Sequence, residues 1–249
     1  MFLSLALTLG HFVACVQQDE VSQSPGSDTD TGGGDWSSAT APLQSLSSAE
    51  CPDLSETNTG SFVSSGEDRT VTVVIPEDTE GPYNVVVFFH GLEYVTAGSS
   101  PTDSWSSYLG LQNLADETGT VFFLPESPTW NIQDFDIGIS YDMEFYLWDV
   151  FDFTDHDVVL FDDLRTCAGE NLDVDLERLS IMGFSGGALF NTVIARERGD
   201  TLASMVSMSG GSDVEALGYE VSTYGAPASK VSSLLVSGGR RRRRRRRRR

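Results

Sequence analysis

The chain has 249 residues, of which 37 are acidic and 16 are basic, so its formal net charge is −21 at neutral pH. Ten of the basic residues are the consecutive arginines at 240–249, and the rest of the chain therefore has a charge of −31. Such an acidic body would repel a phosphate backbone, which excludes nucleic-acid binding by the folded part. A hydrophobic content of 39% is enough for a packed core and excludes a wholly disordered chain.

The N-terminus predicts export. Phe2 to Ala14 are almost wholly apolar and end at Cys15, and this run is too short to cross a bilayer but is typical of a signal peptide over residues 1–15. Phe12 to Cys15 (FVAC) resembles a bacterial lipobox, in which the cysteine carries lipid after cleavage. Two interpretations remain open: a lipoprotein held on a membrane through Cys15, and a plain signal peptide with an incidental cysteine. Both predict a secreted or cell-surface protein.

A flexible tether is expected next. Residues 16–50 are rich in Ser, Gly, Asp and Thr, so they cannot bury enough apolar surface to offset their chain entropy. This segment would let a folded domain at residues 51–239 stand clear of a membrane. Residues 240–249 form a separate poly-arginine tail.

Two cysteines remain once Cys15 is assigned to the anchor. In an exported protein, Cys51 and Cys167 favour one disulfide, and the alternative is a pair of unpaired buried thiols. No Cys-x-x-Cys spacing occurs and the chain has three histidines, so neither a metal site nor a cofactor is expected.

The body alternates strands with helices. Apolar or β-branched runs predict strands at 69–76, 83–90, 120–125, 179–184, 205–209 and 231–237. Helical spacing predicts helices at 106–118, 156–167 (with Asp155 as its cap) and 188–196. Most of these strands are apolar throughout, which favours a mostly parallel sheet with helices on both faces. The aromatic-rich stretch 134–155 is either part of a substrate cleft or ordinary core.

Residues Gly183 to Gly187 (GFSGG) fit the G-x-S-x-G pattern. A strand precedes the pattern and a helix follows it, which is the context of a nucleophile elbow with Ser185 at its tip. The backbone N–H of Gly186, at the start of the helix, would stabilise an oxyanion. The alternative is a turn of small residues that has no chemical role.

His90 and Gly91 end an earlier buried strand. In hydrolases with this elbow, the second oxyanion donor comes from such a position, so we expect the backbone N–H of Leu92, or else that of Gly91, to supply it. The His90 side chain is interpreted as a structural hydrogen-bonding group, because the general base of these enzymes follows the nucleophile in the chain.

Several segments together resemble the family of secreted polyhydroxybutyrate depolymerases and feruloyl esterases. They occur in the family's order between about residues 68 and 239, and they are 85–91 (VVVFFHG), 113–125 (NLADETGTVFFLP), 157–164 (DVVLFDDL) and 173–188 (DVDLERLSIMGFSGGA). The resemblance implies an α/β-hydrolase fold and serine esterase chemistry on a polyester or an ester-decorated plant polysaccharide. It also implies that Ser185 is the nucleophile and that Gly186 and Leu92 occupy the oxyanion positions.

Serine hydrolases of this kind use a catalytic triad of serine, acid and histidine, and the histidine is missing from this sequence. No histidine follows His156, so this sequence has no downstream general base. Asp213 is a candidate acid or an ordinary loop aspartate. We interpret the arginine run as a reading frame broken near Gly239, since a GGC repeat read two nucleotides out of phase gives the arginine codon CGG. The alternative is a natural or appended basic tail that binds anionic surfaces.

Two functions follow from these features. The first is a serine carboxylic ester hydrolase whose partner is an ester polymer or oligomer, with activity impaired by the missing histidine. The second is a non-catalytic surface lipoprotein that uses the hydrolase fold for binding.

Overall fold

The computed structural model describes residues 41–98, 100–131, 133, 143–150, 154–210 and 231–236. Within these ranges a seven-stranded sheet has the order β1-β2-β5-β3-β8-β9-β10. Its strands are β1 (Asn58–Ser64), β2 (Glu67–Val74), β3 (Tyr83–Phe89), β5 (Thr120–Pro125), β8 (Val174–Phe184), β9 (Ser204–Met208) and β10 (Ser232–Val236). The neighbouring strands β5, β3, β8, β9 and β10 pair in parallel. Strands β1 and β2 lie at one edge of the sheet and pair antiparallel, β1 with β2 and β2 with β5.

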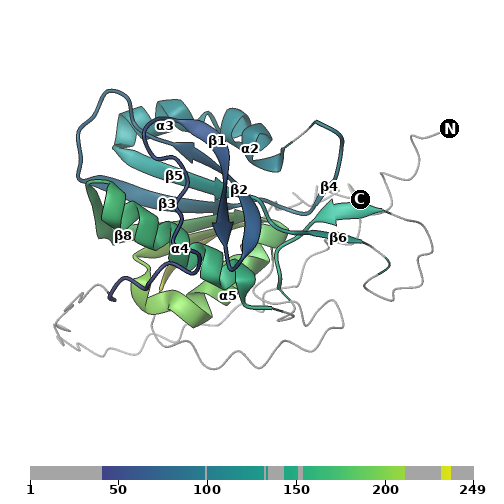
Figure 1. Cartoon of the computed structure of the whole chain (residues 1–249). Helices are drawn as coiled ribbons and strands as arrows, with labels where there is room; N and C mark the ends of the chain where they lie inside the picture. The colour runs from purple at the N-terminus through teal and green to yellow at the C-terminus, as the bar shows by residue number, and fades with distance from the viewer. Residues whose placement is uncertain are drawn as a thin grey trace, which may run out of the picture. The chain divides into compact units, whose positions relative to one another are not determined.

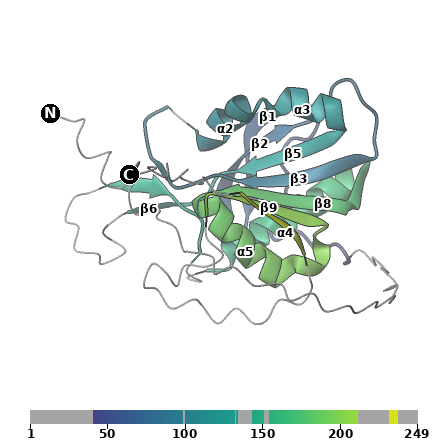
Figure 2. The ribbon, with the colours of Figure 1, turned by 180° about the vertical axis from the view of Figure 1, so that it is seen from behind.

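Helices cover both faces of this sheet. They are α2 (Pro101–Leu109), α3 (Leu111–Thr118), α4 (His156–Asn171) and α5 (Gly186–Arg198), followed by the short 3₁₀ helix η2 (Gly199–Thr201). Figures 1 and 2 show α2 and α3 on one face and α4 and α5 on the other. The predicted architecture, a mostly parallel sheet between two helical layers, is confirmed.

The alternation of side chains along β3 divides the core between the two faces. Val85, Val87 and Phe89 pack in one cluster with residues of α4 and α5. Phe88 faces the opposite way and packs with Leu111 of α3. Because neighbours on a strand point to opposite faces, one continuous apolar run fills both layers.

The structure differs from the predicted elements in three places. The helix expected over 106–118 is two helices, because Gly110 adopts a left-handed φ of 62° and its N–H caps α2. Strand β8 begins at Val174 rather than at residue 179. Strand β1 was not expected from its polar sequence, and it forms by pairing along its length with β2. Asp155 stands at the N-cap of α4, but its side chain makes no capping hydrogen bond.

One strand of a second, three-stranded sheet comes from the aromatic-rich stretch 134–155. The order of this sheet is β4-β7-β6, with β4 (Glu93–Tyr94), β6 (Thr129–Asn131) and β7 (Glu144–Tyr146). Phe145 and Trp148 are buried, and the Trp148 ring stacks on Phe190 of α5 at 5.2 Å between centroids. These two aromatic residues therefore belong to the core. The other aromatic residues at 135, 141, 151 and 153 lie outside the described residues.

The tether prediction is wrong for residues 41–50, which pack against α4. The Arg165 guanidinium donates to the backbone carbonyl of Ala41. The Asp163 carboxylate, on the same helix, accepts from the backbone N–H of Ser47 at 2.9 Å and also from its hydroxyl. Buried charged side chains of α4, far along the chain, thus bind the backbone of this segment. The composition of residues 41–50 gives no sign of these contacts. Residues 1–40 lie outside the described part.

A disulfide joins the end of this segment to α4. Cys51 and Cys167 are bonded, with their Cα atoms 5.6 Å apart, as the cysteine count favoured. In the described part of the chain, none of the helices is both long and apolar enough to cross a bilayer.

Removing the disulfide should lower stability. The bond closes a loop between residues 116 positions apart, so replacing both cysteines (Cys51→Ser with Cys167→Ser) should reduce the free energy of unfolding by about 2–5 kcal/mol. Urea unfolding without reductant measures the change. Dithiothreitol should shift the wild-type midpoint and leave that of the double variant in place. Equal midpoints for the two proteins without reductant would contradict this expectation.

Candidate active site

Ser185 occupies a strained turn between β8 and α5. Its backbone has φ 52° and ψ −112°, a conformation that residues with a side chain rarely adopt. Two hydrogen bonds hold the turn: the Ser185 N–H donates to the Met208 carbonyl of β9 at 2.8 Å, and the Ser185 carbonyl accepts from the Ala188 N–H at 3.0 Å. The predicted strand–turn–helix context of Ser185 is therefore present in the structure.

The glycines on either side of Ser185 allow the turn to fold tightly on itself and to pack directly against the backbone of β3. A Cβ added to Gly183 would lie 2.4 Å from the carbonyl oxygen of Gly187. A Cβ added to Gly187 would lie 2.0 Å from the carbonyl oxygen of Phe89, at the end of β3. Only glycine fits such separations, so the GFSGG pattern serves the packing of the turn against β3 as well as the turn itself.

The turn after β3 lies directly against the elbow. A Cβ added to Gly91 would be 3.3 Å from the Cβ of Ser185, and one added to Gly186 would be 3.4 Å from the backbone nitrogen of Leu92. The structure thus brings His90, Gly91, Leu92, Ser185 and Gly186 together at the carboxyl ends of β3 and β8. Backbone N–H groups near a serine hydroxyl can stabilise the oxyanion of acyl transfer, which is the role predicted for Gly186 and Leu92.

His90 is a neutral, buried part of this arrangement. Its Nδ1 lies 2.6 Å from the Gly91 carbonyl oxygen, and its Nε2 lies 3.1 Å from the Ser127 backbone nitrogen. A carbonyl only accepts and an N–H only donates, so the hydrogen-bond network assigns the proton to Nδ1 and leaves Nε2 as the acceptor. Burial lowers the pKa of His90 to about 4, despite the opposing hydrogen bond to Gly91. Both ring nitrogens are engaged by backbone, as expected for a structural histidine.

His90 also sets the direction of the neighbouring peptide group. The carbonyl of Gly91 and the N–H of Leu92 belong to one peptide, and in a trans peptide these two groups point in opposite directions. By holding the Gly91 carbonyl, His90 turns the Leu92 N–H the other way. The Trp148 indole N–H donates to the His90 carbonyl at 2.9 Å and anchors the same turn to the core.

The structure leaves two of the predicted site residues undescribed. Asp213 and Cys15 lie outside the described residues. His156 opens α4, and its Nδ1 lies 3.0 Å from the carboxylate of Glu67 on β2. Within the described ranges, His, Cys, Asp and Glu side chains form no group of three or more that could hold a metal ion.

Trp105 of α2 is a site residue that sequence reasoning missed. Its ring lies against that of Phe184, the residue before Ser185, with 4.9 Å between centroids. Its indole N–H donates to the Glu93 carboxylate, one residue beyond Leu92. Burial raises the pKa of Glu93. Trp105 therefore connects the elbow to the turn after β3, and a tryptophan within a helix carries no sequence signal for that role.

Comparison with known proteins yields no matching family model and no matching curated protein. Among solved structures, native pOPH is 19% identical over 76% of this chain and 72% of its own, with a TM-score of 0.55. A serine-to-cysteine variant of pOPH in complex with DMSO is 18% identical over 76% and 67%, with a TM-score of 0.53. A thermostable esterase is 15% identical over 74% of this chain, with a TM-score of 0.46, and this chain spans 55% of its length.

The two likenesses to pOPH, together with the mostly parallel sheet and the elbow, identify the fold. The chain has an α/β-hydrolase fold. Hydrolases of this fold carry their nucleophile at a strand–turn–helix of this kind and take the second oxyanion donor from the turn after an earlier strand of the sheet. The fold assignment from sequence is confirmed, whereas identities below 20% leave activity to be argued from the site.

The two glycines after Ser185 should differ in their tolerance of a side chain. Gly187→Ala places a Cβ 2.0 Å from a β3 carbonyl and should cost more than about 3 kcal/mol of stability or prevent folding. Gly186→Ala is the matched control: its Cβ first meets the movable end of Leu147 at 3.1 Å and should cost less than about 1 kcal/mol. Thermal unfolding measures both, and similar midpoints for the two variants would contradict the close approach.

The neutral state of His90 should make stability fall in acid. Its pKa is about 4 in the folded state against an ordinary 6.5, so its contribution is fully present above pH 6.5 and is lost as the pH falls towards 4. The acidic side chains are the same in wild type and His90→Asn, so their titration cancels when the two proteins are compared. The free energy of unfolding of the wild type, taken relative to that of His90→Asn, should therefore decrease by about 3 kcal/mol between about pH 7 and about pH 4. Urea unfolding at the two pH values measures this, and a constant difference would rule out the neutral buried imidazole.

Proposed function

We propose that this chain is a serine hydrolase that acts on carboxylic esters. The observation that carries the proposal is the placement of Ser185 in a strained elbow against which the turn at Gly91 and Leu92 packs. We propose that the backbone N–H groups of Gly186 and Leu92 are the oxyanion donors. Strain of this kind persists where the surrounding structure maintains it, and it concentrates at functional sites. The nearby N–H groups supply what an acyl-transfer transition state needs.

The proposed reaction has two steps. The Ser185 Oγ attacks the ester carbonyl carbon, its proton passes to a general base, and the carbonyl oxygen becomes an oxyanion held by Gly186 and Leu92. Collapse of the tetrahedral intermediate expels the alcohol, which takes up that proton, and leaves an acyl-serine. Water then attacks the acyl-serine and releases the carboxylic acid together with free Ser185.

The reaction needs a general base, and the amino-acid sequence lacks the histidine that serves as the base in a catalytic triad. No histidine follows His156, and both nitrogens of His90 are bonded to backbone. A triad hydrolase that lacks one member retains only about 10³–10⁴-fold acceleration over water. We therefore expect impaired activity in the chain as it stands, and full activity only when an acid and a histidine from a restored downstream reading frame accompany Ser185.

For the substrate we propose a polyester or an ester-decorated polysaccharide. The support is the resemblance of residues 85–91, 113–125, 157–164 and 173–188 to the polyhydroxybutyrate depolymerase and feruloyl esterase-like family. An extracellular enzyme suits such a polymer. We accordingly propose export and attachment to a membrane through a lipid on Cys15, which the apolar run before Cys15 and the disulfide between Cys51 and Cys167 support.

A second candidate function is binding without catalysis. The observation that favours it is the lack of a histidine after His156 in a chain that otherwise retains the elbow. Such a protein would use the hydrolase fold at the cell surface to hold a polymer or a partner.

A fluorophosphonate probe separates the two functions. We expect a chain whose reading frame is restored past codon 239 to be labelled at Ser185, because a triad base makes that hydroxyl nucleophilic. Labelling should disappear in Ser185→Ala. A folded, restored chain that remains unlabelled would favour the binding function and remove the support for an esterase.

The chain without restoration provides the complementary measurement. Hydrolysis of p-nitrophenyl acetate should be slow and close to that of Ser185→Ala. Fast hydrolysis that Ser185→Ala abolishes would show that the elbow works without a downstream histidine, contrary to our expectation.

A further inference from the structure

An apolar surface continues from the turn after β3 into the small sheet. Leu92, Tyr94 and Val95 expose 46%, 46% and 37% of their surface, although each is a large hydrophobic residue. We call these three residues the β4 surface. It adjoins a cavity of about 640 Å³ that Tyr94, Val95, Met143 and Glu144 line. A cavity of this size is within the range of small-molecule sites.

We propose that the β4 surface and this cavity bind an uncharged, apolar acyl or aryl group of the ester substrate. The proposal rests on the proposed function, because it assigns to the same active site a binding position for the group next to the scissile bond. Exposed apolar side chains that adjoin a cavity mark binding surfaces more often than isolated ones do. None of these residues belongs to the predicted catalytic set except Leu92, whose backbone rather than side chain serves the oxyanion.

Two strands connect the cavity to the elbow. Strand β4 begins immediately after Leu92, and the side chain of Leu147, one residue after β7, would lie 3.1 Å from a Cβ on Gly186. Further along, β4 pairs with β7, and the Val95 N–H donates to the Glu144 carbonyl at 3.1 Å. Figure 1 shows β4 and β6 at one end of the main sheet, away from the four helices.

The distance along β4 suits a single substituent of an ester. Val95 lies three positions beyond Leu92, which corresponds to about 10 Å of extended strand. A phenyl ring or a short acyl chain attached to a carbonyl held at Leu92 would lie beside Leu92 and Tyr94, and a longer group would extend to Val95. The position nearest Leu92 is therefore that of a group adjacent to the reacting carbon.

Charge around the cavity excludes an anionic group. Glu144 lines it, and Glu93 lies within β4 between Leu92 and Tyr94. The pKa of Tyr146, which pairs with Glu93 across the strands, is raised by burial and by the negative charges of Glu126 and Glu144. A carboxylate brought into this region would meet the same negative potential, so the site favours neutral esters.

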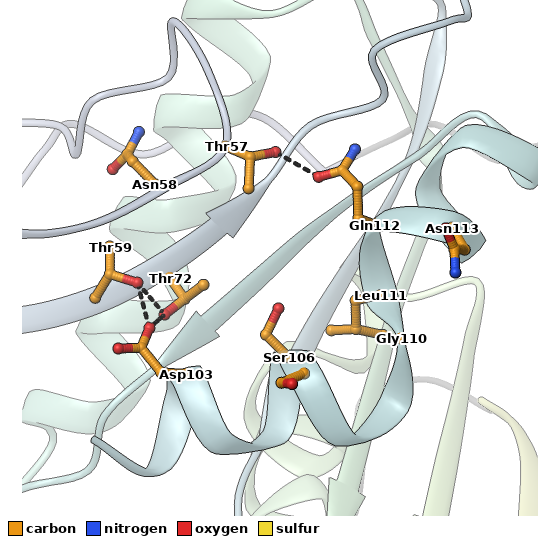
Figure 3. Close-up of a pocket in the computed structure, with 11 residues that line it drawn as sticks. Thr57, Asn58, Thr59, Thr72, Asp103, Ser106, Gly110, Leu111, Gln112 and Asn113 are labelled. Carbon is orange, nitrogen blue, oxygen red and sulfur yellow. Dashed lines mark hydrogen bonds between the residues drawn. The ribbon is translucent and has the colours of Figure 1, made fainter. Parts of the chain in front are cut away.

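A second cavity, of about 350 Å³, lies between β1, β2 and α2 (Figure 3). Two polar pairs of its lining are bonded within the protein: the Thr59 hydroxyl donates to Asp103, and the Thr57 hydroxyl donates to Gln112 at 2.8 Å. Its lining includes no residue of the elbow or of the turn after β3. It is therefore the weaker of the two candidates for a substrate group.

Binding to the full chain carrying Ser185→Ala tests the site without any turnover. Ethyl benzoate serves as the neutral ester, and 4-(ethoxycarbonyl)benzoate as the same ester with an added carboxylate, with Kd taken from ligand-observed NMR titration. We expect ethyl benzoate to bind, and Tyr94→Ser with Val95→Ser to raise its Kd by about tenfold. Leu114→Ser is the matched control, since Leu114 is also an exposed apolar residue (40%) but lies on α3.

The Kd of 4-(ethoxycarbonyl)benzoate should be higher than that of ethyl benzoate. Glu144→Gln should reduce the difference between the two Kd values. Val95→Trp, which fills the cavity and keeps an apolar surface, should weaken ethyl benzoate binding even if the serine variants fold poorly. The proposal is overturned if Ser185→Ala does not bind ethyl benzoate, or if Leu114→Ser weakens binding as much as the β4 variants do. Probe labelling of Ser185 reports on the proposed function separately, so loss of labelling with binding intact would reject the esterase and keep the site.

Discussion

The contact between Gly187 and the end of β3 is the constraint on which the rest of the site depends. Because a Cβ at Gly187 would lie 2.0 Å from the Phe89 carbonyl, the elbow and the turn after β3 touch backbone to backbone. That approach places the nitrogen of Leu92 beside Gly186 and the Gly91 backbone beside Ser185. Any side chain at 187 would push the elbow away from the end of β3 and from the turn that follows it.

Buried side chains connect the turn after β3 to the core. His90 is 1% exposed and bonds the Gly91 carbonyl through one nitrogen and the Ser127 N–H through the other. Trp148 packs against Phe190 and donates to the His90 carbonyl, so the turn is attached to the same core as α5. His90 therefore supports the turn after β3 as a neutral residue, because desolvation disfavours its charged form.

Much of the architecture could be predicted because it depends on local pattern. The buried strands at 83–89 and 120–125 are apolar throughout, and the GFSGG segment combines a strand end, a helix start and small residues. The errors arose where distant groups decide the outcome. Residues 41–50 read as a tether, yet Asp163 and Arg165 of α4 bind their backbone. Trp105 gives no local sign that it joins Phe184 to Glu93.

The sequence by itself determined the alternation of strands and helices, the position of the Ser185 turn, the cysteine pair and the absence of a histidine after His156. These depend on residue type, order and spacing along the chain. The tertiary structure alone decided that Leu92 lies beside Gly186, that His90 is neutral with both ring nitrogens bonded to backbone, and that Leu92, Tyr94 and Val95 form an exposed apolar surface leading into a cavity. Such properties depend on burial and on contacts between segments far apart in the chain, which no local pattern records.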